Sequence, residues 1–236
     1  MMIKEALKYV VENSHPQTYT SHGHTYADKP MIEIDSEFPQ IQMSTLSGLV
    51  EYIKRNPDNI ATQIILHVQS PTKVEAYTCV NDMDDRRYLA AVEPLLPSFP
   101  FGAFRDSEEF LIGLQAKFTP TPDLDLLYKF AGTAESGTVK QYSDDGVTQQ
   151  TTVKNGVSNK VDAIVPNPVL LAPYRTFIEV PQPLSRFIFR MRQGHDNVEC
   201  ALFEADGGAW RNEAMDSIKE YLETALEDVE GLMVIA

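Results

Sequence analysis

The sequence predicts an α+β fold, with an antiparallel or mixed sheet packed against several helices. Segments with the two-residue period of strands are mixed with segments of helical period, and hairpin turns join most of the strands. The helices are interspersed and clustered instead of following every strand. The 236 residues contain neither a repeat nor a low-complexity linker, so we expect a single domain over 1–236.

The N-terminal quarter predicts two helices and two short strands. Apolar residues at helical spacing indicate a helix over 2–13. A short strand fits within 18–26, and alternating apolar and acidic residues predict another over 31–38. The second helix has Ser44 as its N-cap and ends at the Asn56-Pro57 pair.

The middle of the chain begins with three predicted strands. Two of them, over 61–69 and 73–80, are joined by a turn at Ser70-Pro71-Thr72, and the third covers 88–92. The segment 94–105 is apolar but rich in proline, so we expect an ordered coil packed against the body of the protein.

Two predicted helices follow this coil. The first is SEEFLIGLQAKF, capped by Asp106 or Ser107. The second is PDLDLLYKFAG, with Thr121 as its cap, proline at its first helical position and Gly132 as its stop.

The segment 137–162 predicts a polar β-arm. It is rich in Thr, Val and Gln, and it carries hairpin signals at Asp145-Gly146 and Asn155-Gly156. Large apolar residues are few, so we expect these strands to be exposed. Exposed strand edges need a cover, and a second copy of the chain is the simplest one. The arm therefore predicts a homo-oligomer or a site for another partner.

The C-terminal third predicts three strands, a long helix and a last strand. The three strands cover 169–180, 186–192 and 198–204. Two glycines then turn the chain, and Asp206 is placed to cap a helix that runs from about Trp210 to Val229. The final residues LMVIA predict the last strand.

The charge and the cysteines limit the classes of function. A net charge of −14 repels nucleic-acid backbones, so we expect no direct contact with nucleic acid; a basic host protein is a more suitable partner for such a surface. No apolar run approaches the roughly 20 residues of a membrane span, and charges interrupt the N-terminal segment. Two distant cysteines indicate no disulfide framework. We expect a cytoplasmic protein that contacts no membrane.

The candidate binding residues are arginines. On a strand over 186–192, side chains alternate, so Arg186, Ile188, Arg190 and Arg192 share one face, and Phe187, Phe189 and Met191 share the other. Guanidinium groups suit phosphates and carboxylates, which predicts a nucleotide or another anionic small molecule as ligand. The alternative is a solvated face whose arginines pair with nearby acids. The remaining candidates, on the preceding strand and just past the glycine turn, are Tyr174, Arg175 and Arg211.

Other clusters predict no catalytic residue, metal or cofactor. His15, His22 and His24 lie in a polar segment without convergent ligands, and the acidic loop that holds Asp82 and Asp84 lacks the glycine and glutamate of a calcium loop. We find no phosphate-binding loop, dinucleotide fingerprint, nucleophile elbow or zinc-protease helix. These absences favour a protein that is not an enzyme, although they leave activity open.

Several ordered blocks resemble one known family. TLSGLVEYIK, HVQSPTKVEAY, PNPVLLAPYRTFIEVPQP, FIFRMRQG and ALFEADGGAWRNEAM together are similar to a family of phages and prophages, domain of unknown function 2303. The resemblance covers nearly the whole chain. It implies a phage-encoded protein in the cytoplasm of the infected bacterial host, made early in infection, and it supplies no functional residues.

Three functions are compatible with these observations. The first is a non-enzymatic binding protein that antagonises host defence by sequestering a nucleotide signal or by binding a host protein. The alternative is an accessory factor in phage DNA replication or recombination. The third is a nucleotide-processing enzyme that lacks a recognised motif.

Overall fold

The computed structural model describes residues 18–21, 24–27, 39–80, 86–134, 138–144, 149–155, 159–165, 167–195 and 197–236. The chain divides into two compact units, Met1–Pro39 and Gln40–Ala236. In the first unit, β1 (Thr18–Ser21) and β2 (His24–Ala27) pair antiparallel, so the single strand expected within 18–26 is in fact two strands. The predicted helix over 2–13 and strand over 31–38 lie outside the described residues, and the single domain over 1–236 stays a prediction.

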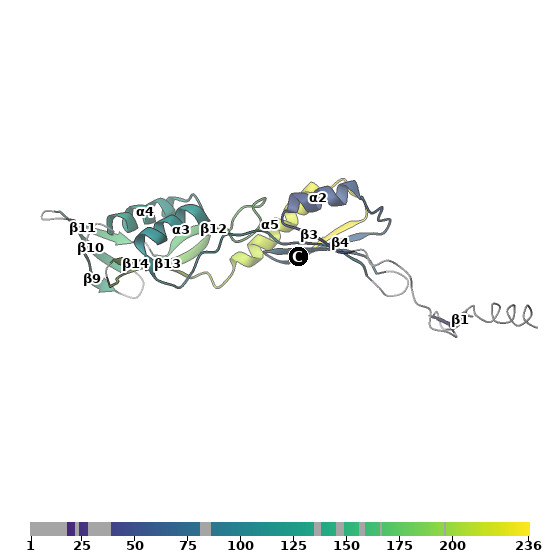
Figure 1. Cartoon of the computed structure of the whole chain (residues 1–236), viewed down its shortest axis with the longest axis horizontal. Coiled ribbons are helices and arrows are strands. Elements are labelled where there is room, and N and C mark those ends of the chain that lie inside the picture. The colour runs from purple at the N-terminus through teal and green to yellow at the C-terminus, as the bar shows by residue number, and fades with distance from the viewer. Residues whose placement is uncertain are drawn as a thin grey trace, which may run out of the picture. The chain divides into compact units, whose positions relative to one another are not determined.

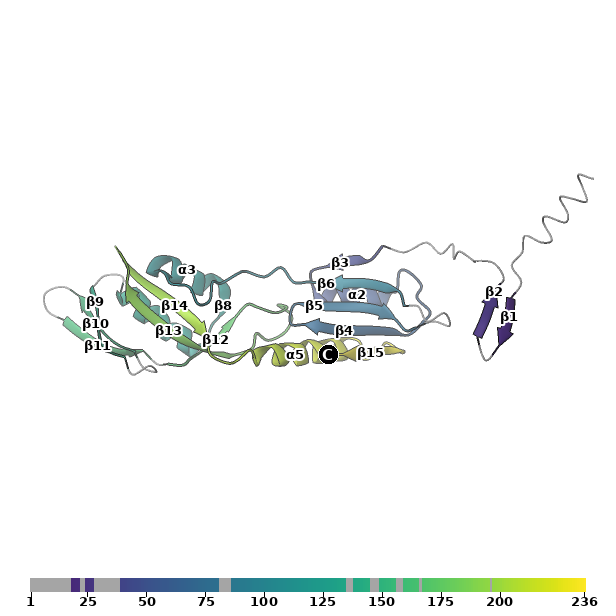
Figure 2. The ribbon, with the colours of Figure 1, turned by 90° about the horizontal axis from the view of Figure 1, so that it is seen from below.

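The second unit contains two five-stranded sheets, and we call the one that includes β4 the first sheet. Figure 1 labels β3 and β4 of this sheet beside α2, and Figure 2 shows its strand order, β15-β4-β5-β6-β3. Its central three strands are antiparallel, and a parallel strand is added at each edge. The elements of this part are β3 (Ile41–Met43), α2 (Leu46–Arg55), β4 (Ile64–Ser70), β5 (Lys73–Thr78), β6 (Tyr88–Val92), α5 (Trp210–Ala225) and β15 (Leu232–Ile235).

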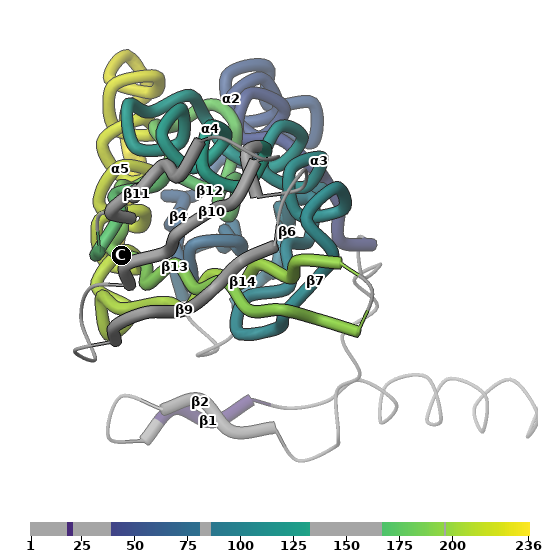
Figure 3. The backbone as a smooth tube through the Cα atoms, turned by 90° about the vertical axis from the view of Figure 1, so that its left-hand side faces the viewer, coloured from purple at the N-terminus to yellow at the C-terminus, as the bar shows by residue number. Residues whose placement is uncertain are grey.

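The second sheet is antiparallel throughout, with the order β7-β14-β13-β12-β8. Helices α3 and α4 lie on the same side of its strands (Figure 3). The elements of this part are β7 (Arg105–Asp106), α3 (Ser107–Lys117), β8 (Phe118–Thr119), α4 (Pro122–Ala134), β12 (Val169–Pro173), β13 (Ser185–Gln193) and β14 (Val198–Glu204).

The predicted β-arm forms a small antiparallel sheet of its own. Its order is β11-β10-β9, and the strands are β9 (Thr138–Asp144), β10 (Gln149–Asn155) and β11 (Asn159–Val165). Strands therefore occupy the segment that the turn signals predicted. The role of this arm in an oligomer stays a prediction.

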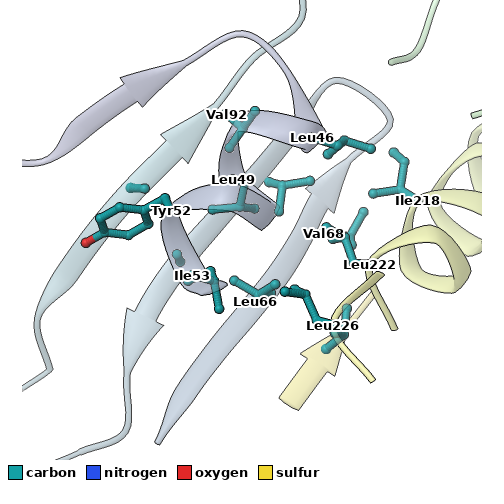
Figure 4. Close-up of a cluster of buried hydrophobic side chains, with 14 of the residues drawn as sticks. Leu46, Leu49, Tyr52, Ile53, Leu66, Val68, Val92, Ile218, Leu222 and Leu226 are labelled. Carbon is teal, nitrogen blue, oxygen red and sulfur yellow. The ribbon is translucent and has the colours of Figure 1, made fainter. Parts of the chain in front are cut away.

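Each five-stranded sheet buries one face in its own hydrophobic core. In the first core, leucines of α2 and apolar residues of α5 pack against β4 and β6, as Figure 4 shows for Leu49, Leu66 and Leu222. In the second core, α3 and α4 pack against β12, β13 and β14. No described helix covers the opposite face of either sheet, and we call these the open faces.

The α+β class is confirmed, and the helix ends refine the predictions. Asp106 caps α3 by accepting from the Glu108 N–H at 2.9 Å, and Thr121 caps α4 by accepting from the Leu124 N–H at 3.1 Å. The N-cap of α2 is Thr45, not Ser44, because the Thr45 hydroxyl reaches the Gly48 N–H at 3.1 Å. No helix in the described part of the chain is long and apolar enough to cross a membrane.

Three predicted ends near the C-terminal half are wrong. Helix α4 continues past Gly132 to Ala134, and α5 ends at Ala225 instead of Val229. The strand predicted over 169–180 ends at Pro173, because the chain there leaves the second sheet.

The predicted cap of α5 is also wrong. The N-cap is Ala209, which makes no side-chain cap hydrogen bond. Asp206 instead accepts from the Gly208 N–H at 3.0 Å. Gly207 and Gly208 have φ of 65° and 84°, so the chain makes a further turn between Asp206 and the helix.

Candidate functional site

The open face of the second sheet carries the predicted arginine strand, β13. Arg186, Arg190 and Arg192 point to this face, whereas the side chains of Phe187, Phe189 and Met191 are buried in the second core. The predicted alternation is confirmed, since buried and accessible residues alternate along β13. We call the three arginines and the residues beside them the arginine face.

Arg192 is bound by its neighbours within the fold. Its Nε lies 2.6 Å from the Glu199 carboxylate, on the paired strand β14. Its guanidinium also lies 4.0 Å from the centre of the Phe104 ring, which is a cation–π distance. The Phe104 ring in turn meets Phe203 edge-on, with centroids 6.0 Å apart. At Arg192, therefore, the alternative of a paired surface arginine is realised.

The other two arginines differ in exposure. Arg190 is half-buried, and its Nη1 donates to the Phe189 carbonyl at 3.1 Å. Arg186 is exposed, and the described residues give it no ion-pair partner. Leu170, directly opposite Arg186 on β12, is 46% exposed. Arg186 is thus the cation on this face that is most accessible to a ligand.

Arg175 lies in a different place, which we call the joint. It is only 9% exposed and is the second residue of the segment 174–184, which leads from β12 to β13. Its Nη1 donates to Glu204 at 3.0 Å, its Nη2 donates to the Ser185 hydroxyl, and its guanidinium stacks 4.0 Å from the centre of the Trp210 ring. Burial lowers the pKa of Arg175 to about 10, so the group remains a cation at neutral pH.

The joint also holds Arg211, which is exposed. The Arg211 guanidinium lies 5.2 Å from the Trp210 ring centre and passes over Gly208, where an added Cβ would come 2.2 Å from Nη1. Burial opposes ionisation of Asp206, but hydrogen bonds from the Gly208 N–H and the Ser185 hydroxyl lower its pKa. The cation that faces the carboxylates of Glu204 and Asp206 is Arg175. Through Arg175, which contacts both Glu204 and Trp210, the joint fastens α5 to the end of the second sheet.

One glutamine fixes the segment 174–184. The Gln182 Oε1 accepts from the backbone N–H groups of Arg175 and Thr176, at 2.9 and 3.2 Å. Its Nε2 donates to the carbonyls of Thr176 and Phe177, at 3.3 and 3.0 Å. The side chains of Phe177 and Val180 then enter the first core. The segment is therefore an ordered connection between the two parts of the unit.

The six predicted residues do not form one site. Arg186, Arg190 and Arg192 belong to the arginine face, and Arg175 and Arg211 belong to the joint. Tyr174 follows the end of β12, and its backbone N–H donates to the Lys117 carbonyl at 2.9 Å. Arg186 and Arg211 are both exposed cations without an ion pair among the described residues, but only Arg186 lies on a sheet face that carries further arginines.

A polar cluster on the open face of the first sheet is not among the residues predicted from the sequence. The Glu75 carboxylate, 5% exposed, lies 2.8 Å from the Lys73 ammonium and accepts hydrogen bonds from the Tyr77 and Tyr88 hydroxyls. Burial favours the neutral acid, yet the hydrogen bonds from these three side chains lower the pKa of Glu75 to about 2. The alternation in KVEAY could have indicated this cluster, because residues 73, 75 and 77 share one face.

The same cluster also raises the pKa of its two tyrosines. Burial, followed by the hydrogen bond to Glu75, raises the pKa of both Tyr77 and Tyr88 to about 12. Their rings stack with centroids 4.8 Å apart. Each polar group of this cluster therefore has a partner in the fold.

Metal ligands do not gather in the described residues. No three His, Cys, Asp or Glu side chains there lie close enough together to hold a metal ion. His15, His22 and the acidic loop with Asp82 and Asp84 lie outside the described residues. Comparison with protein-family models, with curated proteins and with solved structures finds no match for this chain. The resemblance to the phage family stays a prediction.

Proposed function

We propose that this chain is a non-enzymatic, phage-encoded binding protein that sequesters a nucleotide signal on its arginine face and so antagonises host defence. The observation that carries the proposal is the exposed Arg186 on a sheet face that also holds aromatic rings. Nucleotides combine a flat base with a phosphate, and such faces bind them by stacking and by charge-assisted hydrogen bonds.

Each residue of the face has its own part in this proposal. Arg186 is the phosphate ligand, because it is exposed and its guanidinium fork matches phosphate oxygens. Ile188 and Phe203 lie directly opposite each other on β13 and β14 and offer an apolar bed for a base. Arg192 is held by Glu199 and Phe104, so it shapes the edge of this bed more than it attracts charge.

Calorimetric titration with a panel of linear and cyclic nucleotides tests the proposal. We expect at least one nucleotide to bind, and we expect Arg186→Gln to weaken it about 10- to 100-fold, as loss of a charged hydrogen bond does. Arg55→Gln is the matched control, since Arg55 is an exposed arginine on α2 that pairs only with Glu51 among the described residues. A panel without any heat of binding, or equal losses in both variants, would contradict the proposal.

A host protein is the second version of the same function, and α5 favours it. Its outer side exposes the acids Glu213, Asp216, Glu220 and Glu223. A basic partner would be attracted to this row, in line with the net charge of −14. Reversing two of these charges, Glu220→Lys and Glu223→Lys, would then abolish capture of the partner while nucleotide binding stays unchanged.

The aromatic rings beside the arginines also favour the alternative, an accessory factor in phage DNA replication or recombination. Single-stranded DNA uses similar stacking surfaces, although the net charge opposes its approach. This version predicts binding of an oligothymidylate in a mobility-shift titration at low salt, weakened by Arg186→Gln. A flat titration removes the direct-DNA version and leaves the nucleotide proposal intact.

A further inference from the structure

We propose that a surface pocket beside α3 binds a small apolar molecule that carries a single carboxylate. The pocket has a volume of about 260 Å³ and lies between α3 and the coil that precedes β7. It lies on the helix side of the second sheet. Arg105, at its edge, is directly opposite Cys200 in the β7–β14 register, and Cys200 belongs to the second core. None of its residues belongs to the arginine face, so this proposal is independent of the proposed function.

The floor of the pocket is apolar and firmly packed. Gly113 on α3 lets the Phe99 ring lie against the helix, because an added Cβ would come 3.1 Å from the ring. The Phe99 ring also meets Phe118 and Phe110 edge-on, at centroid distances of 4.9 and 6.0 Å. Ile112, at the rim, is 59% exposed. An apolar ligand would therefore cover apolar surface that water now contacts.

The polar groups of the pocket are mainly donors. Lys117 donates its ammonium hydrogen to the Ser98 carbonyl and has no ion pair among the described residues. Arg105 pairs through Nη1 with Glu109 at 2.6 Å, but its Nε is buried without an acceptor. The charged groups that the pocket offers to a ligand oxygen are therefore the Lys117 ammonium and the accessible part of the Arg105 guanidinium.

The charges and the volume define the ligand. Two cations and the Glu109 carboxylate line the pocket, which leaves one positive charge in a chain whose net charge is −14. One carboxylate balances that charge, whereas Glu109 would repel a doubly charged phosphate. The volume lies just below the ~300–1,000 Å³ of sites for drug-sized molecules. A ligand the size of an aromatic amino acid fits this space.

Ligand-observed NMR with 3-phenylpropionate, compared with its neutral amide, tests the proposal on the full chain. We expect the carboxylate to bind with a Kd of about 0.1–1 mM, as its size allows, and the amide to bind about 10-fold more weakly. Lys117→Gln should reduce the difference between the two probes. Absence of binding, or equal binding of acid and amide, would overturn the proposal.

Filling the pocket provides the second test. Ala116 is an exposed pocket residue, so Ala116→Trp should block the probe without disturbing a core. Gln115→Trp is the control, because Gln115 is equally exposed on α3 but does not line the pocket. Thermal unfolding of both variants checks that they fold. Undiminished binding to Ala116→Trp would contradict this location for the site.

Discussion

The two five-stranded sheets each bury one face in a core with helices, but the charged residues on their open faces differ in burial and pairing. On the first sheet, the Glu75 carboxylate is buried, and its partners Lys73, Tyr77 and Tyr88 all belong to the same sheet. On the second sheet, Arg186 is exposed and the described residues give it no ion pair. A charge that the fold satisfies contributes to stability, whereas a charge left to solvent is available to a ligand. The two faces therefore suggest a division between structural and functional charge.

Of the variants on the two open faces, Glu75→Gln should lower the free energy of unfolding the most. Glu75→Gln removes the charge that holds Lys73 and weakens the acceptor of two tyrosine hydroxyls. We expect the free energy of unfolding to fall by about 3 kcal/mol, in the range for a broken buried ion pair. Urea denaturation measures it. A loss under 0.5 kcal/mol would show that the cluster is not structural.

The acid sensitivity of stability gives the next effect. The pKa of Glu75 is about 2 in the folded chain, against an ordinary 4.5, so the unfolded chain binds more protons as the pH falls. Its stabilisation is complete above about pH 4.5 and is lost as the pH falls towards 2. We expect about 2 kcal/mol of this stabilisation to be lost between pH 5 and pH 3, a loss that Glu75→Gln removes. Urea denaturation at pH 5 and pH 3 measures this loss in the unchanged chain and in Glu75→Gln. Equal losses in the two proteins would contradict the prediction.

Within the arginine face, Arg192 and Arg186 should differ in their contribution to stability. Arg192 has Glu199 and Phe104 as partners, so Arg192→Gln should lower the free energy of unfolding by about 1 kcal/mol, the sum expected for an exposed ion pair and a cation–π contact. The measurement is again urea denaturation, with Glu199→Gln as the companion variant. A larger effect at Arg186 than at Arg192 would reverse the assignment.

The smallest expected change is the stability of Arg186→Gln. Because the described residues give this side chain no ion pair, the free energy of unfolding should change by less than about 0.5 kcal/mol. Its effect should be on ligand binding alone. A strongly destabilised Arg186→Gln would mean that the arginine is structural, like Glu75.

The local patterns in the sequence account for much of the fold. Strand β6 covers 88–92 and β14 covers 198–204, as the periodicity predicts, and the alternation in β13 places Arg186 opposite in direction to Phe187. These features depend only on neighbouring residues. They could therefore be predicted before any partner strand was known.

The remaining features depend on residues far apart in the chain. The parallel pairing of β15 with β4 joins two distant segments, and no local period encodes it. The sequence predicts Arg175 on the strand that precedes β13. In the structure its segment leaves the sheet, because Gln182 binds its backbone and Phe177 and Val180 pack in the first core. Aspartate is a common N-cap residue, which is why Asp206 is the predicted cap. The positive φ angles of the two glycines that follow it separate Asp206 from the helix.

The residues of the first core come from widely separated parts of the chain, so the ribosome synthesises them at different times. Helix α2 and strands β4 to β6 emerge early, but Ile218, Leu222 and Leu226 on or beside α5 emerge only after the whole second sheet. Phe177 and Val180 come from between these segments. The nascent chain must therefore hold an incomplete apolar layer until the last helix arrives, which makes chaperone binding to this intermediate an expected stage of its biogenesis.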